Sequence, residues 1–408
     1  MTNNEKALKM HEEWNGKIET TAKAHVNSRE DLAIAYTPGV AEPCKVIAQD
    51  PEAAYKYTMK ANTVAVVSDG SAVLGLGNIG ALAAMPVMEG KAVLFKEFGG
   101  VNAVPICLDT QDTEEIIKSV VNIAPAFGGI NLEDISAPRC FEIETRLKEL
   151  LNIPVFHDDQ HGTAIACLAA VIGALRFVKK DMKTAKFVVN GCGAAGSAIG
   201  RLLISMGAEN VTMVDRFGAL YEGIDANLDR IQSYLATVTN KEHKKGTLAD
   251  IAKGVDVLIG VSAPNVFTKE IIASMADKAI VFALANPVPE TSYADAIEAG
   301  AAVAGTGRSD SPNQVNNVTV FPGVFRGAID VRAKAITEEM KVAAVYAISE
   351  LIDEKDLRAD YVVPDAFDPR VAPAVAAAVA RVAMETGIAR IKVDPEEVRA
   401  NTMKRVGR

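Results

Sequence analysis

A glycine-rich turn at residues 191–196 constrains the fold of this 408-residue chain more than any other segment. The turn, Gly191-Cys-Gly193-Ala-Ala-Gly196, follows the short apolar run Phe187–Asn190 and opens a helical pattern over Ser197–Met206. A strand, a tight glycine turn and a helix in this order are typical of the first half of a β-α-β unit with parallel strands. The turn therefore predicts an open parallel sheet with helices on both faces.

The next apolar run, Val211–Val214, ends on Asp215, about 20 residues after Gly193. Glycines let the backbone approach a pyrophosphate, and the helix N-terminus supplies N–H donors and positive potential. An acidic side chain at the end of the second strand accepts hydrogen bonds from ribose hydroxyls. We therefore predict a dinucleotide site at Gly191, Gly193, Ala194, Ala195, Gly196 and Asp215. Asp215 favours NAD because its charge would repel a 2′-phosphate, whereas the adjacent Arg216 keeps NADP as the alternative.

The pattern around this turn predicts two α/β units. After residue 186, short apolar strands end near Asn190, Asp215, Val261, Asn286 and Gly305, and helix-length segments separate most of them. The tail from Gly327 to Arg408 has a helical pattern. Before residue 160, helices are predicted over about residues 5–30 and Asp50–Lys60, and strands over Thr63–Ser68, Ala92–Phe95 and Ala103–Leu108. We predict an N-terminal α/β domain at residues 1–160 and a Rossmann-type domain with C-terminal helices at 161–408.

Composition and charge exclude some classes of partner and indicate the cellular compartment. The net charge of −9 argues against a nucleic-acid or anionic-membrane surface. Five scattered cysteines without a C-x-x-C pair are typical of a reducing compartment. The N-terminal residues show no secretory pattern, and the apolar stretch Thr163–Val178 is short and contains Arg176, which favours a buried helix over a membrane span. We expect a cytoplasmic protein.

A second glycine motif, Gly75-Leu-Gly77-Asn-Ile-Gly80, lacks the acidic residue at the ribose position. We interpret it as close packing or a substrate-site turn rather than a second dinucleotide site.

Two acidic pairs, Glu133-Asp134 and Asp158-Asp159, predict a cation site. Adjacent carboxylates repel each other unless water or a cation intervenes, and hard divalent ions prefer oxygen ligands. A solvated acidic turn is the alternative for either pair taken alone. His157 and His161 flank the second pair, but no zinc motif accompanies them, so we interpret them as supporting residues.

Six segments in order resemble the malic enzyme family (malate dehydrogenases that decarboxylate oxaloacetate), in its compact prokaryotic form. They are Tyr36-Thr-Pro-Gly-Val40, the turn at 75–80, Gly90-Lys91, Asn131-Leu-Glu-Asp134, His157-Asp-Asp-Gln-His-Gly-Thr163 and Asn316-Asn-Val-Thr-Val-Phe-Pro-Gly323.

The resemblance implies roles for the matching residues. Lys91 would be the general base and Tyr36 the proton donor. The ligands of Mg²⁺ or Mn²⁺ would be Glu133, Asp134 and Asp159. Asn286 and Asn317 would contact the substrate, and Asn286 would also contact the cofactor. Lys96 competes with Lys91 for the basic role. In the larger family members an arginine for a malate carboxylate precedes the Gly-Leu-Gly turn. Here the run Asp69-Gly-Ser-Ala72-Val-Leu-Gly75 has none, which leaves this role to the metal, the asparagines or a basic residue elsewhere.

The implied activity is oxidative decarboxylation of L-malate to pyruvate and CO₂ by a homodimer. Lys91 would take the C2 hydroxyl proton, hydride would pass to the nicotinamide, and Tyr36 would protonate C3 after CO₂ leaves. The alternatives are a malolactic-type decarboxylase, a dehydrogenase of a related hydroxy or amino acid, and a catalytically silent dinucleotide-binding regulator.

Overall fold

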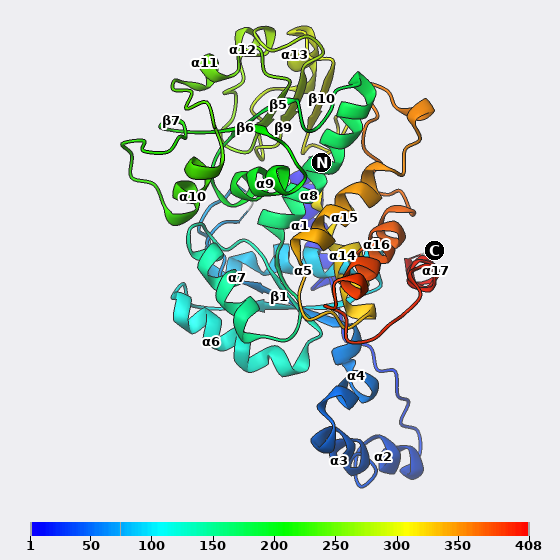
Figure 1. Ribbon diagram of the computed structural model, residues 1–408. Helices are drawn as coiled ribbons and strands as arrows, with labels where there is room; N and C mark the ends of the chain where they lie inside the picture. The colour runs from blue at the N-terminus through cyan, green and yellow to red at the C-terminus, as the bar shows by residue number, and fades with distance from the viewer. Residues whose placement is uncertain (1, 74, 407–408) are drawn as a thin grey trace.

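Two parallel sheets organise the protein (Figure 1). The computed structural model describes residues 2–73 and 75–406. The first sheet has the order β2-β1-β3-β4 and contains β1 (Thr63–Ser68), β2 (Asn102–Cys107), β3 (Gly129–Leu132) and β4 (Val155–His157). The second has the order β10-β9-β8-β5-β6-β7 and contains β5 (Lys186–Asn190), β6 (Asn210–Asp215), β7 (Gly218–Ala219), β8 (Val257–Gly260), β9 (Ile280–Ala283) and β10 (Val303–Thr306). Every pairing is parallel except that of β6 with β7.

Helices cover both faces of each sheet, because successive strand residues point to opposite sides. In β1, Val64 and Val66 belong to the core under α5 and α8, whereas Ala65 and Val67 face α6 and α7. The helices of the first unit are α5 (Gly80–Gly99), α6 (Thr113–Ile123), α7 (Arg139–Leu150) and α8 (Asp158–Val178). Those of the second are α9 (Ala194–Ser205), α10 (Arg230–Val238), α11 (Leu248–Ile251), α12 (Lys269–Ala273) and α13 (Tyr293–Glu298). The predicted α/β class with a Rossmann-type sheet is confirmed.

The helix α8 joins the two units. Its first turn follows β4 at the edge of the first sheet, and its remaining turns pack against α9 and the C-terminal helix α15. Among the described residues it is the one helix whose length and apolar composition match those of a membrane span, yet 83% of its apolar window is buried inside the protein. It is therefore the core helix that the sequence indicates at 163–178.

The C-terminal helices return to the N-terminal unit. They are α14 (Phe321–Asp330), α15 (Glu338–Ser349), α16 (Val371–Glu385) and α17 (Pro395–Val406). Phe325 of α14 has its ring centroid 5.3 Å from that of Phe95 on α5 and 5.8 Å from that of Phe156 on β4. The largest core cluster contains these three rings together with Val189 and Ile259 of the second sheet. The two sheets thus share one continuous core.

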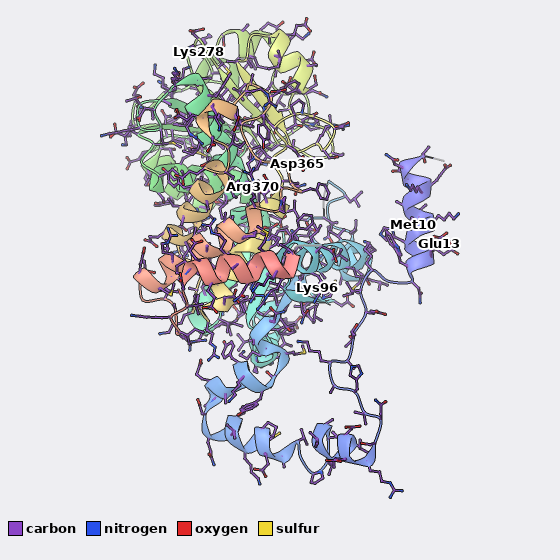
Figure 2. The ribbon with its side chains drawn as sticks, turned by 90° about the vertical axis from the view of Figure 1, so that its right-hand side faces the viewer. Met10, Glu13, Lys96, Lys278, Asp365 and Arg370 are labelled. Atoms are coloured by element: carbon purple, nitrogen blue, oxygen red, sulfur yellow. The ribbon has the colours of Figure 1, made fainter. Side chains whose placement is uncertain are left out.

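Residues before β1 form an arm outside this core. It comprises α1 (Asn3–Trp14), α2 (Arg29–Ala35), α3 (Ala41–Gln49), α4 (Ala54–Tyr57) and two 3-10 turns, Pro51–Ala53 and Met59–Asn62. None of the residues of α1, α2 and α3 is buried. Figure 2 shows α1, marked by Met10 and Glu13, standing apart from the body, and α2 and α3 protruding below it.

Three predicted elements differ from the structure. The predicted strand Ala92–Phe95 is wrong, because these residues lie in α5. Ala84, Met88, Ala92 and Phe95 are buried at helical spacing, and this packing outweighs the β propensity of four residues. The helix predicted over residues 5–30 ends at Trp14, since Asn15 and Gly16 take positive φ. The helix predicted at Asp50–Lys60 is divided into short turns, with extended backbone at Thr58.

Because Phe325 joins the core of both units, Phe325→Ala should destabilise the whole chain by about 3–5 kcal/mol. Chemical denaturation followed by circular dichroism measures this change. Leu82→Ala on α5, where Leu82 is 87% exposed, is the control and should leave the transition unchanged. Equal transitions for the two variants would contradict the shared core.

Candidate active site

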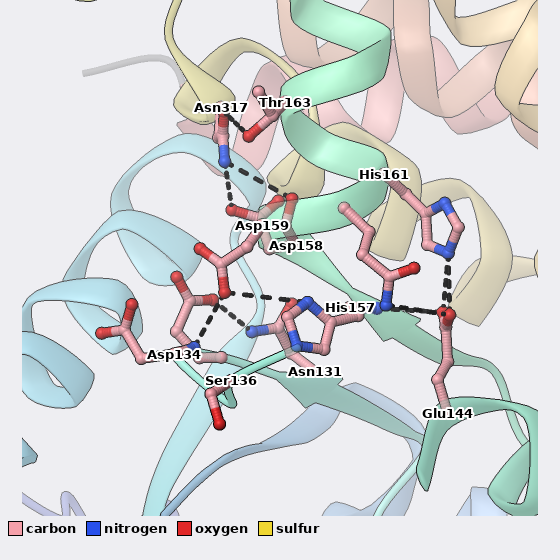
Figure 3. Close-up of polar contacts among 12 residues, drawn as sticks. Asn131, Asp134, Ser136, Glu144, His157, Asp158, Asp159, His161, Thr163 and Asn317 are labelled. Atoms are coloured by element: carbon pink, nitrogen blue, oxygen red, sulfur yellow. Dashed lines mark hydrogen bonds and ion pairs between the residues drawn. The ribbon is translucent and has the colours of Figure 1, made fainter. Parts of the chain in front are cut away.

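Two neighbouring parallel strands bring the acidic pairs together (Figure 3). Glu133 and Asp134 follow β3, and Asp158 and Asp159 follow β4, with Leu132 in register with His157. The carboxyl ends of parallel strands meet at one edge of the sheet, which is where such sheets bind ligands. The Asp134 N–H donates to Asp159 Oδ2 at 2.8 Å, so the two pairs are fixed to each other.

Glu133, Asp134 and Asp159 each offer an oxygen, and these oxygens lie within 4.8 Å of one another. They are the one group of this kind found in residues 2–73 and 75–406. Burial raises the pKa of Glu133 well above its usual value. The Lys91 ammonium lowers this pKa, and the carboxylates of Asp159, Asp158 and Asp134 raise it further. Three clustered carboxylates on rigid strand ends fit a hard divalent cation, which would relieve their repulsion.

Lys91 lies beside this cluster, on the fourth turn of α5. Its ammonium is 2.6 Å from Asp158 Oδ2 and 2.9 Å from Glu133 Oε1, and its side chain is 10% exposed. Burial lowers the pKa of Lys91, but the two carboxylates outweigh burial and raise it above the usual lysine value. Without a bound cation this lysine is therefore protonated, whereas the general base implied by the resemblance must be neutral to accept a proton.

Asp158 is the functional residue that sequence reasoning missed. It is fully buried, pairs with Lys91, and accepts a hydrogen bond of 2.8 Å from Asn317 Nδ2. A carbon added at Gly162, one turn further along α8, would lie 1.9 Å from Asp158 Oδ1, so glycine there makes room for the carboxylate. The available signal was the Asp-Asp pair itself, in which only the second residue was assigned a role.

The two histidines lie behind the cluster. His161 Nε2 contacts the Glu144 carboxylate at 2.8 and 3.0 Å, and Figure 3 shows this ring pointing away from Asp134 and Asp159. His157 is buried, with Nδ1 3.7 Å from Asp159 Oδ2. This arrangement agrees with a supporting role and offers no zinc ligand set among the described residues.

The predicted dinucleotide turn adopts the expected geometry. Gly191 and Gly193 connect β5 to α9, and a carbon added at Gly196 would lie 1.8 Å from Gly191 O, so the turn and the helix approach too closely for any side chain. Asp215 ends β6, where Oδ1 accepts from the Arg216 N–H and Oδ2 from Gln232 Nε2, both at 2.8 Å. A cavity of about 1120 Å³ is lined by the turn, Asp215 and Arg216.

A second cavity, of about 920 Å³, lies between the two sheets and contains most of the predicted site. Its lining includes Lys91, Glu133, Asp134, Asp159, Ala194, Ala195, Asn286 and Asn317. Val261 and Ser262, which follow β8, line both cavities. A dinucleotide bound at the glycine turn can therefore extend from the first cavity into the second.

The asparagines and the other glycine motif meet in this second cavity. Asn286 lies three residues beyond β9 rather than at its end, and Asn317 begins a 3-10 turn, Asn317–Thr319. Gly75 lines the cavity, and a carbon added to it would lie 3.0 Å from Asn286 O. The close approach of Gly75 to Asn286 is the tight packing that is one of the two interpretations of residues 75–80.

Tyr36 is the predicted residue that the chain does not bring to the site. It follows α2 on the protruding arm, is 68% exposed, and is absent from the described lining of both cavities. Lys96, the alternative base, is exposed and donates to Asn102 Oδ1 at 2.8 Å, outside the cavity lining.

Together, these features define a dinucleotide-dependent oxidoreductase with a cluster of acidic side chains in its cavity. The family model "Malic enzyme, N-terminal domain" matches residues 15–148, and "Malic enzyme, NAD binding domain" matches residues 160–384. The chain belongs to the malic enzyme family, whose reaction is oxidative decarboxylation of malate with a nicotinamide dinucleotide. The predicted family and enzyme class are confirmed, and the alternative activities are not favoured.

Individual relatives cover nearly the whole chain. A bifunctional malic/malolactic enzyme of Bacillus subtilis is 57% identical over 99% of this chain and 98% of its own length. An NAD-dependent malic enzyme of Geobacillus stearothermophilus is 56% identical over 92% of this chain and 78% of its own length. The crystal structure of a malic enzyme from Pyrococcus horikoshii, 47% identical, superimposes with a TM-score of 0.96 over 99% of this chain and 96% of that one.

If the acidic cluster holds a divalent ion, Glu133→Gln should weaken Mn²⁺ binding roughly tenfold or more, because a neutral amide is a poorer ligand than a carboxylate. Titration of free Mn²⁺ by electron paramagnetic resonance measures this affinity without turnover. Glu149→Gln, an exposed position on α7, is the matched control. Equal Mn²⁺ affinities for the two variants would exclude Glu133 as a ligand.

Proposed function

We propose that this chain converts L-malate to pyruvate and CO₂ in the cavity between the two sheets, with reduction of NAD. The observation that carries the proposal is the position of Lys91, held by Asp158 and Glu133 at the wall of a cavity that reaches the glycine turn. We propose NAD because the Asp215 carboxylate lies in the nucleotide cavity; NADP is the alternative that Arg216 keeps open. We also propose that residues 1–160 form the N-terminal domain and residues 161–408 the Rossmann-type domain. We further propose that the protein is cytoplasmic.

In this proposal Glu133, Asp134 and Asp159 bind Mg²⁺ or Mn²⁺. When bound, such an ion polarises the oxygen at C2 of the substrate and stabilises the negative charge that develops as CO₂ leaves. The chain contributes the fixed geometry of the three carboxylates, since the hydrogen bond from Asp134 N–H to Asp159 fixes their spacing before any ion arrives.

Lys91 accepts the C2 hydroxyl proton in this proposal. A base must be neutral when substrate arrives, and the bare site instead stabilises the ammonium through two carboxylates. Neutralisation of Glu133 by a bound cation removes one of these two counter-charges and so favours proton release from Lys91. Asp158 remains, and it holds the Lys91 amine in place throughout.

Asn317 and Asn286 orient the substrate. Asn317 Oδ1 accepts from Thr163 Oγ1 at 3.3 Å while its Nδ2 donates to Asp158, so the amide is fixed from both sides. Asn286 is exposed to the cavity beyond β9, on the side where the nicotinamide would enter. Fixed amide groups lower the entropic cost of positioning a small acid.

The direct test is turnover of L-malate with Mn²⁺ and either NAD⁺ or NADP⁺, following dinucleotide reduction, pyruvate and CO₂ together. We expect all three in equal amounts, faster with NAD⁺, and abolished by a chelator. Lactate without net reduction would overturn the proposal in favour of malolactic chemistry. Dinucleotide binding without any turnover would overturn it in favour of a regulator.

We further propose a homodimer in which Tyr36 of one copy serves the cavity of the other. Tyr36 lies outside its own cavity, on helices without buried residues. The arm also exposes Leu32, Ile34, Val40 and Val46, apolar side chains that a second copy would cover. In that position the tyrosine hydroxyl would protonate C3 after CO₂ leaves.

Mixing two inactive variants tests this exchange. Tyr36→Phe and Lys91→Ala should each lose most pyruvate formation, and a co-refolded or co-expressed mixture should regain activity, because each heterodimer contains one cavity with both groups intact. The expected recovery is about a quarter of the wild-type rate for random pairing of two-site dimers. Absence of recovery, with heterodimers verified by differential tags, would place both residues in the same chain's site.

A further inference from the structure

The cavity between the two sheets is lined by one lysine that the mechanism does not use. Among its described lining residues the lysines are Lys17 and Lys91, beside the carboxylates of Glu133, Asp134 and Asp159. The charge of Lys91 is paired with the Glu133 and Asp158 carboxylates. No ion pair involves the Lys17 ammonium within the part of the chain that the structure describes, so its charge is the one left for a ligand.

The arm is fastened to α5 at Lys17. The Lys17 backbone N–H donates to Glu89 Oε2 at 3.0 Å, and its ammonium donates to Pro86 O at 2.6 Å. A carbon added at Gly90 would lie 3.8 Å from Lys17 Nζ, so the ammonium rests on the helix backbone one residue before Lys91. An ammonium has three donors, and with one directed to Pro86 O two remain for an anion in the cavity.

We propose that Lys17 binds the substrate carboxylate that the acidic cluster does not hold, and so selects dicarboxylic over monocarboxylic hydroxy acids. This inference rests on the proposed function. A dicarboxylate brings two negative charges into a cavity already rich in carboxylates. A cation at Glu133, Asp134 and Asp159 compensates one end, and the other end needs a second positive charge. Lys17 would supply it from the part of the cavity wall that α5 forms.

The environment of Lys17 strengthens such a contact. Its side chain is partly covered by α5, and partial desolvation makes a charge-assisted hydrogen bond stronger than it would be in open water. Burial lowers the pKa of Lys17 more than the Glu89 carboxylate raises it, so a bound anion also compensates a partly desolvated ammonium. Lys17 would make this contact both in the bound substrate and in the transition state for oxidation. Such a contact lowers KM without raising kcat.

Lys17→Met tests the inference, since it removes the charge and keeps a long stem. We expect the KM for L-malate to rise roughly tenfold or more with kcat changed much less, and the KM for the dinucleotide to stay the same. Lys17→Arg should recover part of the affinity. Lys96→Met, at an exposed lysine of α5 outside the cavity lining, is the matched control and should behave as wild type.

Ligand binding gives a readout independent of turnover. Titration calorimetry on the full chain with Mn²⁺ and NADH compares L-malate with oxalate, whose two carboxylates can both occupy the cation site and leave nothing for Lys17. Lys17→Met should weaken L-malate binding about tenfold and leave oxalate unchanged. Unchanged L-malate affinity, or equal losses for both ligands, would overturn the inference. A wild-type chain that makes no pyruvate would instead refute the proposed function.

Discussion

The contact between the Lys91 ammonium and the Asp158 and Glu133 carboxylates is the interaction on which the site depends. Four carboxylates gather at two adjacent strand ends, and burying three of them without compensation would cost far more than a marginally stable fold can supply. Lys91 compensates part of this charge in the bare chain. The remaining negative charge would be compensated by the small, hard cation of the proposed function.

The fold places these groups by joining two sheets at their carboxyl ends. The helix α8 begins with Asp158 and Asp159 at the first sheet and then crosses into the core of the second, so acidic residues and dinucleotide turn are parts of one rigid connection. Strand order reverses between β5 and β8, and the residues that follow these strands line both cavities. Chemistry at the junction therefore needs little rearrangement of either sheet, although the arm that carries Tyr36 lies elsewhere.

Local signals in the sequence predicted the Rossmann-type unit well, and tertiary effects account for the differences. Between Phe187 and Asp215, a strand, a glycine turn, a helix and a strand follow one another within about 30 residues, so short-range rules suffice. The run Ala92–Phe95 was predicted as a strand, because its β-favouring residues hide a helical burial pattern that begins eight residues earlier at Ala84. Asp158 and Lys17 escaped notice for a different reason: their roles come from contacts with α5, about 70 residues distant in the sequence.

The arm carries Lys17 and Tyr36, the two residues to which we assign substrate binding and protonation, in a segment that its own core does not bury. Lys17 fastens one part of it to α5 at the cavity, whereas the part with Tyr36 extends away from the body. A segment with exposed apolar residues and few contacts of its own gains stability when a second copy covers it. The helix α5 carries Lys91 and also accepts the hydrogen bond from Lys17. Movement of the arm on assembly would therefore shift side chains that line the cavity. In the proposed dimer, assembly and substrate recognition would therefore be coupled through the arm, whereas the acidic cluster and the dinucleotide turn belong to the sheets.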